Sequence, residues 1–191
     1  SLDEERQLLF VLGPAGFGLP SYIQGSRPLD WKRTGRRRMA CLLGIDVGSS
    51  SIKTGLIASD GSALAQATRN SVTFEPKPGF KEQDPEAWWS AARDSIREVA
   101  QSVPRSDLAA LGTSGHISSL TFVDVSGRVL RPAIGFQDLR AIEELNDLYA
   151  RFTREDLSER MGIDLPPAAT WPLPKLLWLQ KHEPATLELA H

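Results

Sequence analysis

The fold is indicated by one stretch of the chain, CLLGIDVGSSSIKTGLIASDGS, which occupies residues 41–62. Its first part, residues 41–45, is a short apolar run, and the small polar residues 46–50 after it are typical of a tight turn. A second apolar run covers residues 51–58, and the Asp60-Gly61 pair that follows is a strong hairpin signal. With a third run at residues 63–74, the sequence predicts three consecutive strands joined by two tight turns.

Helices and strands alternate after this three-strand meander. Asp84, Pro85 and Glu86 predict a helix start, because a capping side chain, a first-turn proline and an early acidic residue favour one; apolar residues then recur at helical spacing to Val103. A strand is expected at residues 108–113. Further helices are expected at 137–150, at 153–161 with Thr153 as cap, and at 176–180, after a segment broken by four prolines. This order predicts an α/β layered fold.

Composition excludes several classes of protein. The chain has 191 residues, a formal net charge of −2 and a single cysteine, Cys41, so it is not a disulfide scaffold and a reducing, cytoplasmic compartment is expected. No apolar run reaches the roughly 18–20 residues that a membrane span requires. The near-neutral charge does not favour a nucleic-acid partner.

Residues 1–38 differ from the rest of the chain. They carry seven basic and four acidic residues, and glycine and proline are dense from residue 13 to residue 28. A secretory segment is disfavoured, because the apolar stretch at 8–19 follows acidic residues and contains glycine and proline. Arg36–Arg38 is too short to indicate a nucleic-acid or targeting patch. We expect residues 1–38 to form a poorly ordered extension and the domain to occupy residues 39–191.

The first candidate site is the turn between the first two predicted strands. A strand delivers the carboxylate of Asp46 into a run of small residues, and the next strand carries Lys53. Backbone N–H groups and hydroxyls in such a turn suit an anion, a carboxylate suits hydrated Mg²⁺, and a lysine supplies charge to a phosphate. The spacing matches neither a Walker loop nor G-x-G-x-x-G. An ordinary hairpin is the alternative interpretation.

The second candidate site follows the predicted strand at 108–113. Small polar residues at the end of a buried strand lie where ligands gather in α/β proteins. His116 stands in this segment, although a surface or capping histidine is the alternative. Ser114 is disfavoured as a nucleophile, because its surroundings do not match the G-x-S-x-G elbow.

Aromatic residues and a carboxylate supply weaker candidates. Asp138 follows Phe136 at a strand–helix junction, where it could also be a simple helix cap. Trp171 stands among prolines and could line a sugar site or fill a gap in the core. Trp88 and Trp89 have helical spacing, which favours a core position. No cysteine and histidine cluster has the spacing of metal ligands.

Taken in order, five stretches resemble the N-terminal half of the FGGY family of carbohydrate kinases, with xylulokinases as the nearest members. Each stretch is weak alone, and their joint order over about residues 41–185 carries the resemblance. They are Gly44-Ile45-Asp46-Val47-Gly48-Ser49-Ser50 with Lys53, Pro78-Gly79-Phe80-Lys81-Glu82-Gln83-Asp84-Pro85-Glu86-Ala87-Trp88-Trp89, Gly112-Thr113-Ser114-Gly115-His116, residues 130–140 with Asp138 and Arg140, and Pro174-Lys175-Leu176-Leu177-Trp178-Leu179.

The resemblance implies a specific architecture and activity. It implies an actin/RNase H-like domain, one of two such domains flanking a cleft, and transfer of the γ-phosphoryl group of ATP to a sugar or polyol hydroxyl with Mg²⁺. Asp46 would position Mg²⁺ and phosphate, and Lys53 would contact phosphate together with the turn residues Gly48, Ser49 and Ser50. The sugar pocket would be lined by His116, Ile117, Ser118, Phe136, Asp138 and Trp171.

The sequence departs from the xylulokinase pattern at the sugar pocket. Xylulokinases commonly read Ser-Gly-Gln-Met-His-Gly where this chain has residues 114–119, so Ser118 replaces the family histidine and His116 stands two positions earlier. The Trp-Asn-Asp of xylulokinases becomes Phe136-Gln137-Asp138. A changed hydrogen-bonding group alters discrimination strongly, so the substrate is left open between a pentulose such as xylulose and a related polyol.

Several alternatives remain open at this point. In the family the aspartate that accepts the sugar proton lies beyond these segments, so we expect the 191 residues alone to be inactive and the chain to be a fragment or truncation. A non-catalytic sugar- or nucleotide-binding module is the second hypothesis. An actin-like ATPase with a protein partner is the third, and a purely structural α/β domain is the fourth. A homodimer of the full-length protein is also left open.

Overall fold

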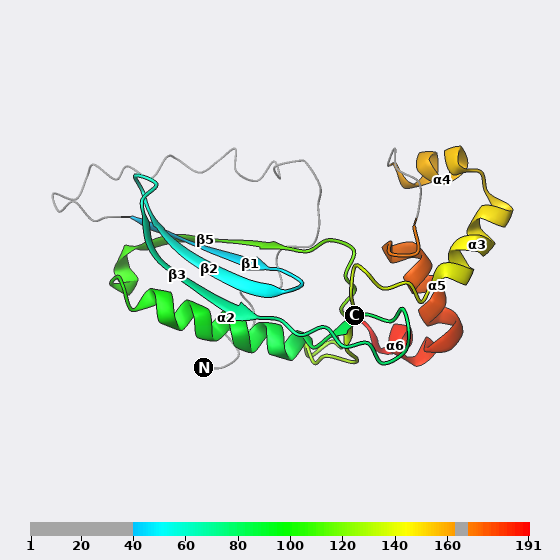
Figure 1. Ribbon diagram of the computed structural model, residues 1–191, viewed down its shortest axis with the longest axis horizontal. Coiled ribbons are helices and arrows are strands. Elements are labelled where there is room, and N and C mark those ends of the chain that lie inside the picture. The colour runs from blue at the N-terminus through cyan, green and yellow to red at the C-terminus, as the bar shows by residue number, and fades with distance from the viewer. Residues whose placement is uncertain (1–39, 163–167) are drawn as a thin grey trace.

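The computed structural model describes residues 40–162 and 168–191, so the extension predicted for residues 1–38 lies outside the described residues. The described chain has two parts (Figure 1). One is a sheet with the helix α2, Pro85–Ala100, along one of its faces, and the other is a group of helices at the far end of the molecule. Short pairs of extended segments lie between these two parts.

The sheet confirms the predicted meander. Its strands are β1 (Cys41–Val47), β2 (Ser51–Ala58), β3 (Ala63–Asn70) and β5 (Leu108–Gly115), in the order β3-β2-β1-β5. The first three strands pair antiparallel, whereas β5 is parallel to β1. The third strand is shorter than predicted, because the chain leaves the sheet after Asn70 and Phe74 pairs with Glu82 instead. This meander with a parallel fourth strand confirms the α/β layered prediction.

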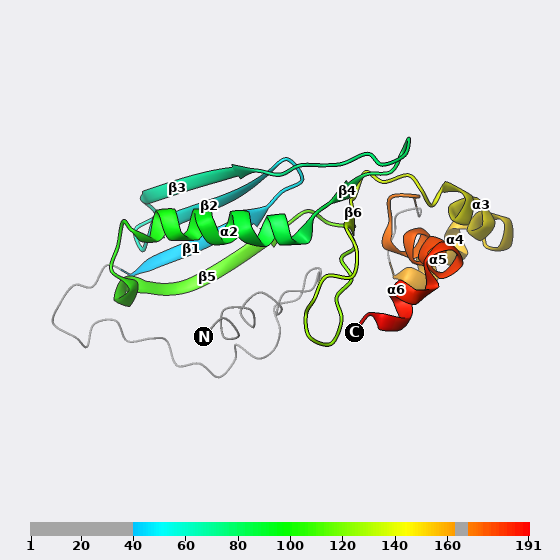
Figure 2. The ribbon, with the colours of Figure 1, turned by 90° about the horizontal axis from the view of Figure 1, so that it is seen from below.

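Helix α2 packs against one face of the sheet (Figure 2). Alternate residues of β1, among them Leu43 and Ile45, are buried on this face with Ala92 and Val99 of the helix. Asp84 caps the helix as predicted, since its side chain accepts a hydrogen bond from the backbone N–H of Glu86 at 2.9 Å. The helix ends at Ala100, slightly before the predicted end, and is followed by the short η3 turn, Arg105–Asp107.

The connection between the sheet and the helical group contains strands that the sequence did not predict. β4 (Glu82–Gln83) pairs antiparallel with β6 (Ala133–Ile134). Residues 120–123 and 128–130 face each other across the turn at 124–127, where Val123 and Val129 form an isolated bridge.

The helical group consists of α3 (Ile142–Arg151), α4 (Arg154–Met161), α5 (Pro172–His182) and α6 (Pro184–Leu189). Thr153 caps α4 as predicted, with its hydroxyl accepting from the N–H of Asp156 at 3.1 Å. A second apolar core joins this group to the connecting segment and contains Phe122, Ile134 and Leu179.

Two helix starts differ from the prediction. The helix predicted from residue 137 begins at Ile142. Residues 137–141 stay outside it, because the N–H of Leu139 donates to the carbonyl of Gly79 and Asp138 forms a buried ion pair with Arg140. The helix predicted from residue 176 begins at Pro172. Proline is compatible with the first helical turn, where its missing N–H is not needed.

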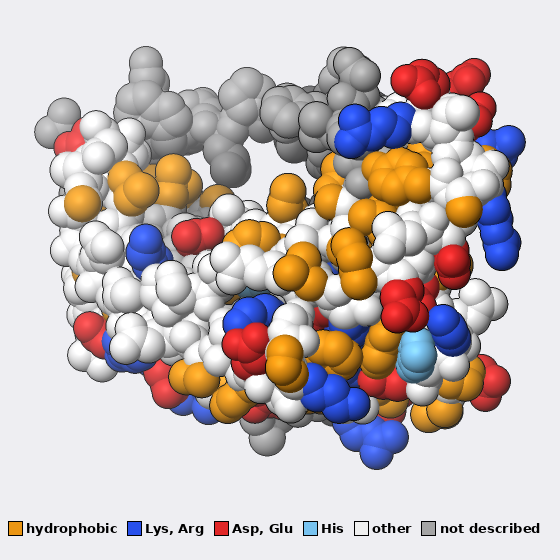
Figure 3. All heavy atoms as spheres, turned by 45° about the vertical axis from the view of Figure 1, so that its right-hand side comes forward, with side chains coloured by type: hydrophobic (Ala, Val, Ile, Leu, Met, Phe, Trp, Pro, Cys, Tyr) orange, Lys and Arg blue, Asp and Glu red, His pale blue; other side chains and the backbone are white. Residues whose placement is uncertain are grey.

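Charges of both signs are interspersed with hydrophobic side chains on the face shown in Figure 3. Within residues 40–162 and 168–191, no helix combines the length and the apolar character of a membrane span.

Candidate functional site

Asp46 and Lys53 lie opposite each other at the end of the β1–β2 hairpin. They are directly paired in the antiparallel register, so both side chains leave the sheet on the same face. That face is opposite to α2, because the neighbours Ile45, Ile52 and Thr54 are the residues buried beneath the helix. The two side chains border an open hollow of about 460 Å³, which is also lined by glycines of three strands and by Ser114. The structure thus brings the two predicted phosphate-site residues together.

The turn that follows Asp46 has a tightly defined backbone. The N–H of Gly48 donates to the carbonyl of Ser51 at 3.0 Å, and a Cβ on Gly48 would lie only 2.8 Å from that oxygen and 4.0 Å from a carboxylate oxygen of Asp46. The carbonyl of Ser49 accepts from the Gln83 side chain at 2.6 Å, and that of Ser50 accepts from the N–H of Ser71 at 2.9 Å. Contacts from outside the hairpin therefore hold the predicted phosphate-binding turn in one conformation.

The donor set at this turn is compatible with a hydrated magnesium ion. Mg²⁺ usually keeps several waters and takes one or two carboxylates, so the exposed carboxylate of Asp46 suffices. No cluster of three or more potential metal-ligating side chains occurs among the residues that the structure describes. The turn residues would therefore suit an ion that also binds phosphate oxygens. Among the described residues, no set of protein ligands in this region would hold the ion alone.

His116 joins the hairpin to a second cluster. Its backbone N–H and its Nδ1 atom both approach the carbonyl of Val47, at 3.2 and 2.9 Å. A carbonyl only accepts, so Nδ1 carries the hydrogen in this contact and Nε2 is left as an acceptor in the neutral ring. The ring packs edge-on against Trp88 at 5.3 Å between centroids and lies 6.1 Å from Phe136. Two predicted sugar-site residues, His116 and Phe136, thus lie side by side.

Three polar atoms in this neighbourhood are buried without a hydrogen-bond partner among the described residues. They are Nε2 of His116, Nε1 of Trp88 and Oγ of Ser119. An unpaired buried polar group costs about 1–3 kcal/mol, so such atoms mark a place where an unseen polar group is expected. Trp88 and Ser119 were missed as site candidates. Helical spacing indicated a core position for Trp88, and it does pack on the core with Ile45 and Ile52.

Ile117 and Ser118 occupy a strained corner after β5. Ile117 is 75% exposed, and Ser118 has a φ of 61°, in the left-handed region that residues other than glycine rarely adopt. The carbonyl of Ser118 accepts a hydrogen bond from the Nζ atom of Lys175 at 2.8 Å. Ser118 is therefore fixed through its backbone from a distant helix.

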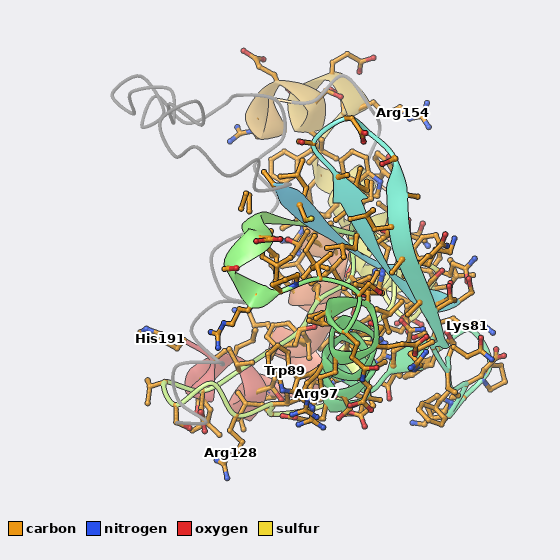
Figure 4. The ribbon with its side chains drawn as sticks, turned by 90° about the vertical axis from the view of Figure 1, so that its left-hand side faces the viewer. Lys81, Trp89, Arg97, Arg128, Arg154 and His191 are labelled. Atoms are coloured by element: carbon orange, nitrogen blue, oxygen red, sulfur yellow. The ribbon has the colours of Figure 1, made fainter. Side chains whose placement is uncertain are left out.

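Asp138 is fully buried and its carboxylate is occupied by protein donors. It forms an ion pair with Arg140 at 2.8 Å and accepts the backbone N–H of Lys81 at 2.6 Å. Arg140 also pairs with Glu82 at 2.7 Å and lies over the Phe80 ring. The structure places the Asp138 carboxylate in this ion-pair cluster, whereas Phe136, two residues earlier, lies against His116. The side chain of Lys81 points outward at the edge of the molecule (Figure 4).

Trp171 stands at the N-cap position of α5, and its N–H donates to the carbonyl of Ala168 at 2.9 Å. It is half-buried. Within the first turns of the same helix lies Lys175, which belongs to the Pro174–Leu179 motif and was not predicted as a site residue. Its side chain is fully buried, and desolvation lowers its pKa to about 8. A lysine in the otherwise apolar run Leu173–Leu179 was the sequence signal for this residue.

Known proteins match this chain over the same region. A xylulose kinase of Escherichia coli strain K12 is 37% identical over 142 residues, covering 74% of this chain and 28% of that protein. A xylulose kinase of Staphylococcus xylosus is 32% identical over 145 residues, covering 76% of this chain and 30% of that protein. The crystal structure of a xylulose kinase from Rhodospirillum rubrum matches with a TM-score of 0.72 and 29% identity, over 78% of this chain and 31% of that one.

The chain therefore spans less than a third of the length of these relatives. The solved neighbours are carbohydrate kinases of the actin/RNase H-like fold, which confirms the predicted fold class for this part of the molecule. Residues 41–191 match the model of the FGGY family of carbohydrate kinases, N-terminal domain. This match covers well over half of the chain, and the chain therefore belongs to the FGGY family of carbohydrate kinases.

Proposed function

We propose that this chain is the N-terminal, substrate-binding part of a kinase that transfers a phosphoryl group from ATP to a hydroxyl of a pentulose or a related polyol. One observation carries the proposal. Asp46 and Lys53 border one hollow, and Val47, which directly follows Asp46, is hydrogen-bonded to His116. His116 lies in a cluster with unpartnered polar atoms. The turn and the cluster around His116 are thus linked through a single carbonyl group. The xylulose kinases among its relatives support a pentulose as the first substrate to test.

The hairpin is suited to the phosphate end of such a reaction. Phosphoryl transfer demands positioning and charge neutralisation more than covalent chemistry from the protein. Lys53 would neutralise phosphate charge, and the small residues Gly48, Ser49 and Ser50 would let a phosphate approach the backbone. Asp46 would hold Mg²⁺, which supplies further charge neutralisation when bound.

The cluster around His116 is suited to binding the sugar or polyol, whose hydroxyl would accept the phosphoryl group. Nε2 of His116 accepts in the neutral ring and Nε1 of Trp88 only donates, so a hydroxyl that donates would satisfy the first atom and a hydroxyl that accepts would satisfy the second. Aromatic rings at Trp88 and Phe136 offer apolar faces for the carbon skeleton. We place Ile117, Ser118 and Trp171 in the wall of this pocket. Asp138 would act on the wall through the backbone, because its carboxylate fixes the segment that follows Phe136.

The direct test is an ADP-release assay on the natural polypeptide that contains these residues, with ATP, Mg²⁺ and a panel of ketopentoses, ketohexoses and polyols. We expect sugar-dependent ADP release with one member of the panel, and a rise in its KM on His116→Ala because the hydroxyl loses its acceptor. Tight sugar binding without turnover would contradict the kinase and support a binding module. The 191 residues alone are expected to release no ADP.

A further inference from the structure

We propose that Lys175 is a positioning residue that joins three segments of the proposed sugar pocket, namely those that carry His116, Phe136 and Trp171. This inference rests on the proposed function for the identity of the ligand. The two hydrogen bonds that Lys175 makes to these segments do not depend on that function. Lys175 is not proposed to touch the sugar, and it acts through the backbone groups that it holds.

The Nζ atom of Lys175 makes two hydrogen bonds to two different segments. It donates to the carbonyl of Ser118 at 2.8 Å and to the carbonyl of Gly135 at 2.7 Å. These acceptors are 57 and 40 residues away along the chain. A single buried atom on α5 therefore bonds both the segment after β5 and the segment after β6, which the backbones of Leu120 and Ile134 also pair directly.

Each held segment carries proposed contacts. Ser118 belongs to the segment that begins with His116, and Gly135 directly precedes Phe136. The third segment is the start of α5 itself, where Trp171 stands four residues before Lys175, about one helical turn away. Among the described residues, Lys175 alone lies on one of these segments and is hydrogen-bonded to both of the others.

The two carbonyls need a strong donor because their backbones are unusual. Ser118 is held at a φ of 61°, which is strained for a residue other than glycine and persists only where the surroundings enforce it. At Gly135 a Cβ would lie 2.9 Å from the carbonyl of Lys81, so this segment already approaches another backbone closely. Both the charged and the neutral amine carry at least two N–H groups, so either form can serve both acceptors.

Three variants separate positioning from general stability. Lys175→Met keeps the length and the apolar stem but removes the donors. Lys175→Arg keeps donors at the end of a long side chain. Lys181→Met is the matched control, because Lys181 is on the same helix with its side chain 56% exposed. All three are made in the natural polypeptide that contains these residues.

Amide hydrogen exchange without any ligand is the first measurement. We expect Lys175→Met to raise exchange at residues 116–120 and 135–139 by about tenfold or more, while β1 and β2 remain at the wild-type rate. Lys175→Arg is expected to restore part of the protection, and Lys181→Met is expected to match the wild type. Unchanged exchange in both segments, or an equal rise in the sheet, would overturn the proposal.

Steady-state kinetics with the sugar identified in the panel is the second measurement. We expect Lys175→Met to raise the KM for the sugar by about 10- to 100-fold, as small misplacements of contact groups do, with the KM for ATP within about twofold of wild type. A parallel rise in both KM values would contradict a positioning role. If no sugar supports turnover, the proposed function fails, and the exchange measurement still decides whether Lys175 joins the segments.

Discussion

The β1–β2 hairpin and the segments held by Lys175 are two halves of the same candidate site, but they are built in different ways. In the hairpin, Asp46 and Lys53 are only seven residues apart and meet because an antiparallel pair brings them into register. Around Lys175, each contact joins residues 40 or more positions apart. The ion pair of Asp138 with Arg140 is local, yet Arg140 reaches Glu82 across 58 positions.

This difference shows where each half derives its rigidity. The hairpin is fixed mainly by turn chemistry and strand pairing, and the outside contacts of its turn come from Gln83 and Ser71 and not from the helical group. The segments at 116–119 and 135–140 depend on buried charged groups of β4 and α5. We therefore expect substitutions in the second half to affect stability and sugar binding together, whereas those in the hairpin should act mainly on the phosphate end.

The largest expected effect on stability is at Arg140. Its guanidinium is almost fully buried between Asp138 and Glu82, so Arg140→Met would leave two carboxylates without this partner. Removing one partner of a buried ion pair typically costs about 3–5 kcal/mol of unfolding free energy. The matched control is Arg128→Met, because Arg128 pairs with Asp124 while 76% exposed and should cost under about 1 kcal/mol. Equal costs in chemical denaturation would contradict the stabilising role assigned to the buried charges around Arg140.

The second effect concerns pH and Lys175. Burial lowers the pKa of Lys175 from 10.5 to about 8, with Asp138 opposing that shift and Arg140 adding to it. Between pH 8 and pH 10.5 the unfolded chain binds a proton that the folded chain does not, so this group makes unfolding less favourable as pH rises.

Denaturation at pH 7.5, 9 and 10.5 measures this contribution as a difference between wild type and Lys175→Met. The wild type should gain up to about 3 kcal/mol of stability relative to the variant across this window. A constant difference, or a gain by the variant, would show that the amine is not held in a desolvated position.

A smaller effect on stability is expected in the hairpin, at Gly48. Gly48→Ala places a methyl group 2.8 Å from the carbonyl of Ser51, so the turn must open. We expect a loss of about 1–3 kcal/mol in unfolding free energy and a higher KM for ATP, with the KM for sugar little changed. Gly55→Ala is the control for stability, because nothing lies within 4 Å of its added Cβ. If both variants behave alike, the turn does not need its present shape.

The sequence predicted the first half of the site better than the second, for the same physical reason. Asp46, Gly48 and Lys53 lie in one local motif, and the Asp84 and Thr153 caps are likewise local signals that the structure confirms. The start of α3 was predicted five residues too early, because local periodicity does not show that Asp138 is used in a buried ion pair. Lys175 and Trp88 could not be assigned from spacing, since their partners are distant in the chain.

The central claim is that the turn after β1 holds the phosphate end of the reaction. The most direct test compares Asp46→Asn with Asp60→Asn, a matched exposed carboxylate in the next turn of the same meander. In the natural polypeptide we expect Asp46→Asn to lower kcat by roughly 100- to 1,000-fold, with unfolding free energy unchanged, and Asp60→Asn to stay within about twofold. Wild-type turnover by the Asp46→Asn protein would contradict the account.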